Sequence, residues 1–234
     1  MISLCLTTYN RTDLLFQSFE QVINDDRISE IVISDDRSDD NIYQAILDKY
    51  KGVEKVKIFR NHQNLDCYRN KRQAVKLATN DWVIIFDSDN IITPKYIDAI
   101  CSKSWEPSII LQPSFAKPHF NFRNFIGTVT KNNLRHLMND ATFQTMLNAM
   151  NYFVNRNEYL RVWDYSQPLL NQLDPVTSDS LFQNYAWLAS GNSFSVVADM
   201  EYEHRVHDGS HYQQNVRRTP QGFHDSIIQK LKQL

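Results

Sequence analysis

Short apolar runs alternate with amphipathic helical segments through the first 97 residues, and this alternation constrains the fold more than any other feature. The apolar runs, which we predict to be strands, cover residues 2–8, 31–33, 56–59 and 82–86. Helical periodicity follows three of them, from a cap at Thr12-Asp13 to Ile23, over 41–50 and over 68–78. Strand–helix alternation predicts an open α/β sheet, and the wholly apolar run 82–86 is typical of a parallel sheet covered on both faces.

The second half of the chain is less regular. Strands are predicted over 109–111, 194–197 and 202–206, and a long loop rich in Phe, His, Pro and Asn over 113–125. Helices are predicted after Pro94 and over 132–138, 142–150, 178–189 and 223–234. We interpret the chain as a single domain with a regular α/β half (1–97), a mixed half (98–222) and a C-terminal helix (223–234). The few cations of that helix favour packing onto the domain over seating on a membrane.

Composition narrows the partners and the compartment. The net charge of −2 over 234 residues provides no positive field for nucleic acid. Three scattered cysteines are too few for a disulfide framework or a zinc cluster, which indicates a reducing compartment. No signal peptide or membrane span is recognisable, so a cytoplasmic protein is expected, with only peripheral contact at the inner face of a membrane left open.

Polar side chains follow three of the predicted strands, at the point where each strand ends. The segments are 7–11 (TTYNR), 35–38 (DDRS) and 87–90 (DSDN). Because the carboxyl ends of parallel strands meet at one edge, these groups are expected to converge there, where such folds bind ligands. Carboxylates without an interleaved base repel one another, and a divalent cation relieves the repulsion. Mg²⁺ or Mn²⁺ bound this way also takes phosphate oxygens, which favours a diphosphate ligand.

The triplet Asp87-Ser88-Asp89 carries little information alone, since roughly one or two Asp-x-Asp pairs are expected by chance in this composition. Its position directly after the apolar strand gives it weight. The alternative interpretation is a strand-end turn in which Asp89 or Asn90 caps a helix.

Four blocks, in order and with natural spacing over residues 1–97, resemble the family 2 glycosyltransferases, which have the GT-A fold. The blocks are Thr-x-Tyr-Asn at 7–10, Asp-Asp-x-Ser-x-Asp at 35–40, Arg-Asn at 69–70, and Asp-aromatic through Asp-x-Asp at 81–89. Segments 178–181, 190–192 and 202–210 resemble the family more loosely. The resemblance implies a GT-A domain with an open, mostly parallel sheet flanked by helices, in which residues 1–97 are the nucleotide-binding half and residues 98–222 the acceptor-binding half. It also implies metal-dependent, inverting sugar transfer from a nucleotide sugar to a hydroxyl of a glycan or glycolipid, as in polysaccharide biosynthesis.

The resemblance also implies roles on the donor side. Tyr9 would stack on the nucleotide base, Asp36 would accept a hydrogen bond from a base N–H, and Thr7 would hold the base through its backbone. Arg69 would face the diphosphate or the base. UDP is the default nucleotide because Tyr9 and Asp36 suit uracil, while GDP and dTDP sugars stay open.

Further roles concern the metal and the acceptor. Asp87 would bind the ribose or the metal's water shell, and Asp89 would coordinate Mn²⁺ or Mg²⁺ directly. His207, in a His-rich segment, would complete the protein ligands of the metal as a neutral imidazole. Asp179 would be the general base, unless it or its neighbour only caps the helix that begins there. Asp164 and Asp174 are weaker candidates for the base.

Two departures from the family pattern affect the nucleotide site. Asn64 stands where the third block usually has Gly, and Asn tolerates the positive φ that such a turn needs. Arg37 replaces a small residue and either contacts the nucleotide or is solvated.

Two other functions remain in competition: a nucleotidyltransferase, which the absence of a Gly-rich basic loop disfavours, and a non-catalytic nucleotide- or carbohydrate-binding module.

Overall fold

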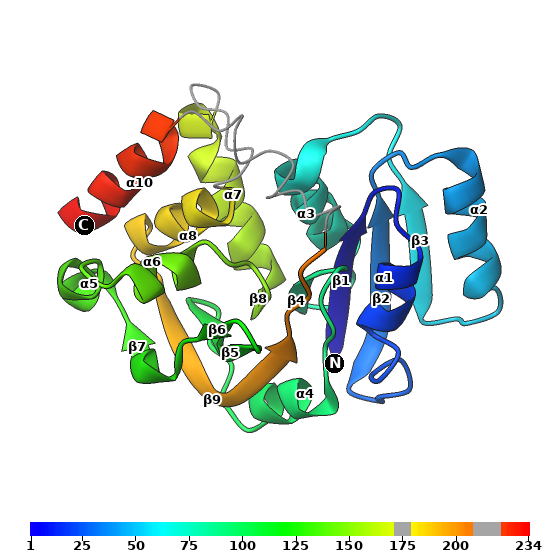
Figure 1. Cartoon of the computed structure of the whole chain (residues 1–234), viewed down its shortest axis with the longest axis horizontal. Helices are drawn as coiled ribbons and strands as arrows, with labels where there is room; N and C mark the ends of the chain where they lie inside the picture. The colour runs from blue at the N-terminus through cyan, green and yellow to red at the C-terminus, as the bar shows by residue number, and fades with distance from the viewer. Residues whose placement is uncertain (171–178, 208–220) are drawn as a thin grey trace.

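One continuous sheet of nine strands runs through the part of the chain that the computed structural model describes, residues 1–170, 179–207 and 221–234. The strand order is β3-β2-β1-β4-β8-β5-β9-β7, with β6 paired to β5 (Figure 1). The strands are β1 (Ile2–Thr8), β2 (Ile28–Asp35), β3 (Val56–Arg60), β4 (Trp82–Asp87), β5 (Ile109–Lys117), β6 (Phe120–Asn121), β7 (Gly127–Val129), β8 (Tyr152–Asn155) and β9 (Ser193–Glu203).

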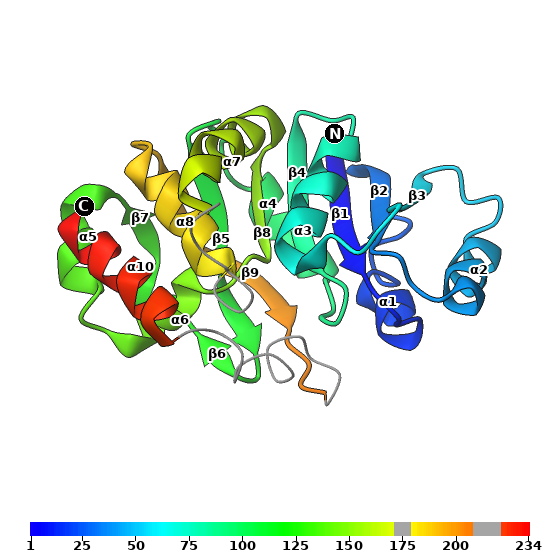
Figure 2. The ribbon, with the colours of Figure 1, turned by 90° about the horizontal axis from the view of Figure 1, so that it is seen from above.

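Helices cover both faces of this sheet. They are α1 (Asp13–Ser18), α2 (Asp40–Lys49), α3 (Asp66–Leu77), α4 (Pro94–Cys101), the 3₁₀ turn η1 (Arg123–Phe125), α5 (Lys131–Leu137), α6 (Ala141–Leu147), α7 (Arg156–Leu170), α8 (Asp179–Ala189) and α10 (Gln221–Gln233). Seen from above, α5, α6 and α10 gather at one end of the molecule, and β2, β3 and α2 lie at the other (Figure 2). The predicted α/β class, with helices flanking an open sheet, is therefore confirmed.

The alternation of side chains along the central strands explains the two-sided covering. On β4, Val83 and Ile85 belong to a core shared with α3 and α5–α8, while Ile84 and Phe86 belong to the core of α1, α2 and α4. Successive strand residues point to opposite faces, so a strand buried on both sides must be apolar at every position. Strands β1 to β4 are parallel, as the apolar runs predicted.

The second half departs from the sequence prediction in its strands. The predicted loop 113–125 is wrong because β5 continues to Lys117, where it pairs in parallel with β9. Backbone pairing with a strand 84 to 86 residues further along the chain leaves no local signal, and Pro113 sits at the irregularity in this pairing. Strand β9 is a single element that ends at Glu203, so the predicted strand over 202–206 stops early. The antiparallel strand β8, between β4 and β5, was not predicted.

Helix boundaries also differ. The first helix stops at Ser18 because two turns follow, closed by hydrogen bonds from Val22 N–H to Phe19 O and from Asp25 N–H to Val22 O. Both turns still bury Phe19 and Val22. Helix α7 was not predicted, and α6 ends at Leu147.

The C-terminal helix α10 packs on the domain. Ile227 and Leu231 are fully buried in the core shared with α8, and the ring of Phe223 lies 6.4 Å from that of Phe182. This matches the apolar helix face expected from the sequence. None of the described helices is both long and apolar enough to span a bilayer.

Candidate functional site

The carboxyl ends of β1, β2 and β4 meet at one edge of the sheet. Thr7 pairs with Asp87 across β1 and β4, and Thr8 pairs with Asp35 across β1 and β2. The Ser88 hydroxyl donates to Thr7 O at 2.6 Å. The predicted convergence of the strand-end groups is therefore found in the structure, and Ser88 is a structural member of the triplet that ties β4 to β1.

Asp87 lies in a dense polar network. Its Oδ1 is 3.1 Å from Lys71 Nζ, its Oδ2 accepts from Asn151 Nδ2 at 3.2 Å, and its own N–H donates to Asn151 Oδ1 at 2.7 Å. Burial raises the pKa of Asp87, and Lys71 opposes this effect. Burial also disfavours the charge of Lys71, but Asp179 and Asp87 outweigh it and hold the pKa of the ammonium well above its usual range. Both oxygens of Asp87 are thus engaged by protein groups.

Asp89 is surrounded by different partners. Its Oδ2 is 3.0 Å from Arg11 Nη1 and 3.1 Å from His207 Nε2. Burial opposes the ionisation of Asp89, but Arg11 and His207 outweigh it and lower the pKa of this carboxyl. Two of the three residues predicted to serve the metal, Asp89 and His207, are therefore in direct contact across 118 positions of sequence, whereas the third, Asp87, contacts Lys71 and Asn151.

Arg205 explains how the segment after β9 reaches Asp89. Its guanidinium donates to the backbone carbonyls of Asp89 and Leu14, the latter at 2.8 Å, and to Gln17 Oε1 at 2.9 Å. The backbone N–H of Arg205 donates to Asn90 Oδ1 at 3.2 Å. Arg205 is therefore held by carbonyl and amide oxygens of α1 and of the turn after β4, and it fixes the segment that carries His207.

The cap interpretation of the triplet is wrong. The helix after β4 begins only at Pro94, and Thr93 is its N-cap residue. Asp89 faces Arg11 and His207, and Asn90 accepts from Arg205, so neither residue stabilises a helix end.

The contact between Asp89 and His207 fits a divalent cation. Two ligands on adjacent corners of an octahedron with metal–ligand distances near 2.1 Å are about 3 Å apart. A carboxylate oxygen and an imidazole nitrogen 3.1 Å apart match this spacing, and the carboxylate suits Mn²⁺ or Mg²⁺. The described residues contain no group of three or more His, Cys, Asp or Glu side chains arranged to hold a metal. A cation here would need phosphate or water oxygens for its other positions.

Asp179 enters the site from the second half of the chain. It is the first residue of α8, is buried, and has its Oδ2 3.5 Å from the same Lys71 Nζ that contacts Asp87. Of the weaker candidates, Asp164 is an exposed residue of α7 that pairs with Arg72 at 2.8 Å, and Asp174 lies outside the described residues. Of the two candidates for the base that the structure describes, Asp179 therefore lies beside Lys71 and Asp87, and Asp164 pairs with Arg72 instead.

The groups predicted to hold the nucleotide base lie in the loops next to this network. Asp36 is buried and accepts from Leu65 N–H at 2.8 Å and Asn61 Nδ2 at 2.9 Å, both on Oδ1, and burial raises its pKa. Tyr9 is 49% exposed, so its ring is accessible to a ligand. Arg69 is half-exposed and pairs with Asp66 on its own helix, without contact to the site carboxylates among the described groups.

Backbone strain gathers around Asp36. Three residues other than Gly have a positive φ after β1, β2 and β3: Asn10 at 48° and Arg37 at 70° in loops, and Asp66 at 67° at the start of α3. Such strain is common at ligand sites, where surrounding contacts enforce it. Asn64 was expected to take a positive φ, but Asp66 does so instead, and Asn64 donates its Nδ2 to Asp36 O at 3.1 Å.

Sequence reasoning missed Lys71, Asn151 and Arg11 as partners of the site carboxylates. A signal existed for Lys71, because it lies three, four and seven positions before the buried residues Ala74, Val75 and Ala78 and so shares their helix face. Asn151 precedes β8, a strand that the sequence did not reveal.

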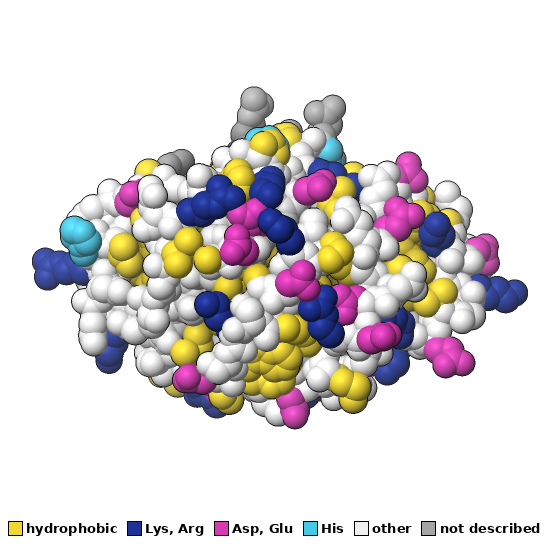
Figure 3. Space-filling view, turned by 90° about the horizontal axis from the view of Figure 1, so that it is seen from below, with side chains coloured by type: hydrophobic (Ala, Val, Ile, Leu, Met, Phe, Trp, Pro, Cys, Tyr) yellow, Lys and Arg dark blue, Asp and Glu magenta, His cyan; other side chains and the backbone are white. Residues whose placement is uncertain are grey.

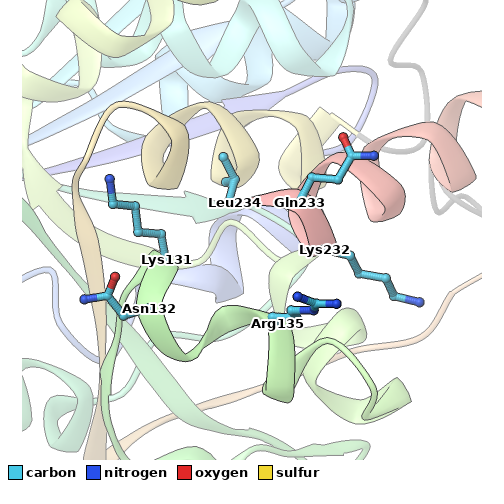
Figure 4. A pocket seen from close by; sticks show the side chains of 6 residues that line it. All are labelled: Lys131, Asn132, Arg135, Lys232, Gln233 and Leu234. Atoms are coloured by element: carbon cyan, nitrogen blue, oxygen red, sulfur yellow. The ribbon is translucent and has the colours of Figure 1, made fainter.

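Other surface features lie apart from this network. The hollow between α5 and α10, about 450 Å³, is lined by Lys131, Asn132, Arg135, Lys232, Gln233 and Leu234, but its cations point in different directions (Figure 4). From below, basic and acidic side chains are interspersed over the molecule, without a large area of one sign on this face (Figure 3). In the aromatic segment 113–125, Phe122 is core, whereas Phe120 is exposed beside His204, 5.0 Å between ring centroids.

Comparison with solved structures shows a shared fold. GalNAc-T7, crystallised with UDP, GalNAc and Mn²⁺, superposes with a TM-score of 0.63 and 15% identity, covering 89% of this chain and 44% of that one. TarS 1–349 of S. aureus, in complex with UDP-GlcNAc, gives a TM-score of 0.64 and 17% identity, covering 98% of this chain and 71% of that one. Both likenesses concern the GT-A fold.

Sequence comparison adds the family. The abequosyltransferase RfbV of Salmonella typhimurium is 33% identical over 97 residues, which cover 39% of this chain and 29% of that protein. This chain therefore spans less than a third of that relative's length. The model of glycosyl transferase family 2 matches residues 3–126, which are more than half of the chain and include β2 to β4 and all of β1 except Ile2. The chain belongs to glycosyl transferase family 2.

Proposed function

We propose that this protein transfers a sugar from a nucleotide-sugar donor, with UDP as the expected nucleotide, to a hydroxyl of a glycan or glycolipid, with inversion at the anomeric carbon. The observation that carries the proposal is the shared contact of Asp87 and Asp179 with Lys71, at 3.1 and 3.5 Å. It brings a carboxylate of the acceptor half next to the strand-end carboxylates that follow the nucleotide-binding strands. Membership of the family supports the same reading.

The donor base would bind in the loops after β1 and β2. The exposed ring of Tyr9 offers a stacking surface, and Thr7 lies beside it at the end of β1. Asp36 Oδ1 is held by two protein donors, whereas its Oδ2 has no donor among the described residues and is free to accept a base N–H. Arg69 would turn from Asp66 toward the base or the diphosphate, since an exposed ion pair holds it only weakly.

Asp89 and His207 would hold Mn²⁺ or Mg²⁺, with the remaining positions taken by diphosphate and water. When bound, the cation neutralises the charge that develops on the leaving diphosphate. Lys71 and Asn151 already engage one oxygen of Asp87 each. Asp87 is therefore better suited to a ribose hydroxyl or to the water shell of the cation than to direct coordination of the cation.

Asp179 would act as the general base. The acceptor hydroxyl oxygen attacks the anomeric carbon, its proton passes to the Asp179 carboxylate, and the bond from carbon to the phosphate oxygen breaks. The nucleoside diphosphate departs with the electron pair. Since Lys71 contacts Oδ2, the other oxygen of Asp179 is the one expected to face the acceptor; Ser180 Oγ lies 3.4 Å from it.

A panel of UDP-, GDP- and dTDP-sugars, scored for hydrolysis with Mn²⁺ or EDTA, tests this function, since water can replace the acceptor. We expect Mn²⁺-dependent hydrolysis of one donor, reduced about 100-fold or more in Asp179→Asn and Asp89→Asn. Arg161→Met, which removes an exposed ion pair with Glu158, is the control. Unchanged turnover in both Asp variants would refute the proposal. UDP binding without turnover on any glycan would favour a binding module, and pyrophosphate release from a nucleoside triphosphate would favour a nucleotidyltransferase.

A further inference from the structure

Lys71 is a buried cation that joins the two halves of the molecule. Its side chain is only 4% exposed, and its ammonium lies between Asp87 of β4 and Asp179 of α8. A lysine is almost never fully buried unless it is paired. In this site the pairing is double, with one carboxylate from the nucleotide-binding strands and one from the acceptor half.

The helix that carries Lys71 is fixed on both sides. Toward the sheet, Asn70 donates its Nδ2 to Ser34 O at 3.1 Å. Toward the second half, the Tyr68 hydroxyl donates to Gln183 Oε1 at 2.9 Å, and the Tyr68 ring stacks on Trp163 at 5.5 Å. These contacts come from the residues immediately around Lys71, so its Cα has little freedom to move relative to β2 or α8.

Without the ammonium, the two carboxylates would face each other across a buried space. Like charges in a low-dielectric site repel, and one of them must turn away or bind a proton. The ammonium carries three donors on one nitrogen and can hold both carboxylates at once. Its effect is therefore to fix where each carboxylate points as well as to neutralise it.

We propose that Lys71 is a positioning residue for sugar transfer: it holds the Asp179 carboxylate in the orientation in which it takes the acceptor proton, using Asp87 as the fixed second support. The inference rests on the proposed function, since it requires Asp179 to be the base. In this role Lys71 acts through the two carboxylates and not by contact with donor or acceptor. It reaches the proposed donor site only through Asp87, which Asn151 still holds by two hydrogen bonds, and it makes no contact with Tyr9 or Asp36 among the described residues, so donor binding is expected to depend on it little.

The test compares Lys71→Met with Asp179→Asn in the full chain. Two quantities are measured: the Kd for UDP by calorimetry with Mn²⁺ present, and kcat for hydrolysis of the UDP-sugar that turns over fastest in the donor panel. For Lys71→Met we expect kcat to fall about 100-fold while the Kd for UDP changes less than about 3-fold. The control is Lys57→Met, which removes a lysine paired with buried Glu30 on β2, away from the site. It should lower Tm and leave kcat unchanged.

Each outcome distinguishes this inference from the proposed function. If Asp179→Asn keeps wild-type turnover, the proposed function fails and the inference falls with it. If Asp179→Asn is inactive while Lys71→Met turns over within about 3-fold of wild type, only the inference is overturned. A parallel loss of kcat and UDP affinity in Lys71→Met would show a merely structural role and would also overturn it.

Stability supplies a second readout in case Lys71→Met folds poorly. In the double variant Lys71→Met/Asp179→Asn, one of the two buried carboxylates that lose Lys71, that of residue 179, is replaced by a neutral amide. Its Tm is expected to lie above that of Lys71→Met alone. A double variant no more stable than Lys71→Met would show that the two side chains are not coupled, and the inference would be overturned.

Discussion

Replacing Arg205 by Met should weaken both the fold and the metal site, because one guanidinium fixes the segment that carries His207. Arg205 donates to the carbonyls of Asp89 and Leu14 and to Gln17 Oε1. Each charge-assisted hydrogen bond contributes roughly 1–1.5 kcal/mol at a half-buried position, so the variant should lose about 3 kcal/mol of unfolding free energy. In a chain of this length that loss corresponds to a Tm lower by roughly 6–12 °C.

The effect on metal binding follows from the same contacts. His207 lies two residues after Arg205 and 3.1 Å from Asp89, so loosening the segment should cost about 10-fold in Mn²⁺ affinity. Titration of Mn²⁺ followed by electron paramagnetic resonance in the presence of UDP measures that affinity, and urea unfolding measures stability. Arg161→Met, at an exposed ion pair with Glu158, should change neither. Mn²⁺ affinity equal to wild type in Arg205→Met would refute the reasoning that Arg205 positions His207.

Three further predictions concern stability. Glu30→Gln should cost about 2–3 kcal/mol in urea unfolding, because this buried carboxylate accepts from the buried Ser3 hydroxyl and from Thr79 N–H. Burial opposes the charge of Glu30, but Lys57 and other donors outweigh it and lower the pKa of this carboxyl. The difference in unfolding free energy between wild type and Glu30→Gln should therefore be complete above about pH 4.5 and shrink as the pH falls below it. Arg37→Gly should raise stability by up to about 1 kcal/mol by relieving a φ of 70°, read as Tm. Leu231→Ala should cost about 3 kcal/mol, whereas Lys230→Ala should be neutral; equal effects would argue against packing of α10 on the domain.

The fold of the first half was predictable because its burial is two-sided and local. Residues 82–86 are apolar at every position, which identifies a covered parallel strand from composition alone. Helix α7 shows the opposite case. Pro168 and many polar residues leave no helical pattern in its sequence, and the helix is stabilised by packing of Tyr159 and Val162 on the core. Strand β5 likewise depends on its neighbours, because Gln112 and Ser114 are buried polar residues whose place only the sheet determines.

The candidate site was predictable to the extent that it follows strand ends. Asp89 and His207 were expected to meet and lie in contact, although their role in metal binding stays a prediction. Lys71 was not foreseen, because an isolated lysine on an amphipathic helix is usually solvated. Its position depends on the packing of α3 between the sheet and α8, which is a property of the tertiary structure.

Basic side chains lie among the carboxylates of the site. The sequence predicted a cluster of carboxylates without a base between them, but Lys71 lies between Asp87 and Asp179, and Arg11 pairs with Asp89. The acidic groups are therefore already compensated, so relief of repulsion does not by itself require a cation. Asp89 and the imidazole next to it supply only two ligands, while phosphate oxygens add ligands and charge together. It follows that cation and diphosphate should bind as a unit, with the diphosphate also replacing Asp89 as the partner of Arg11.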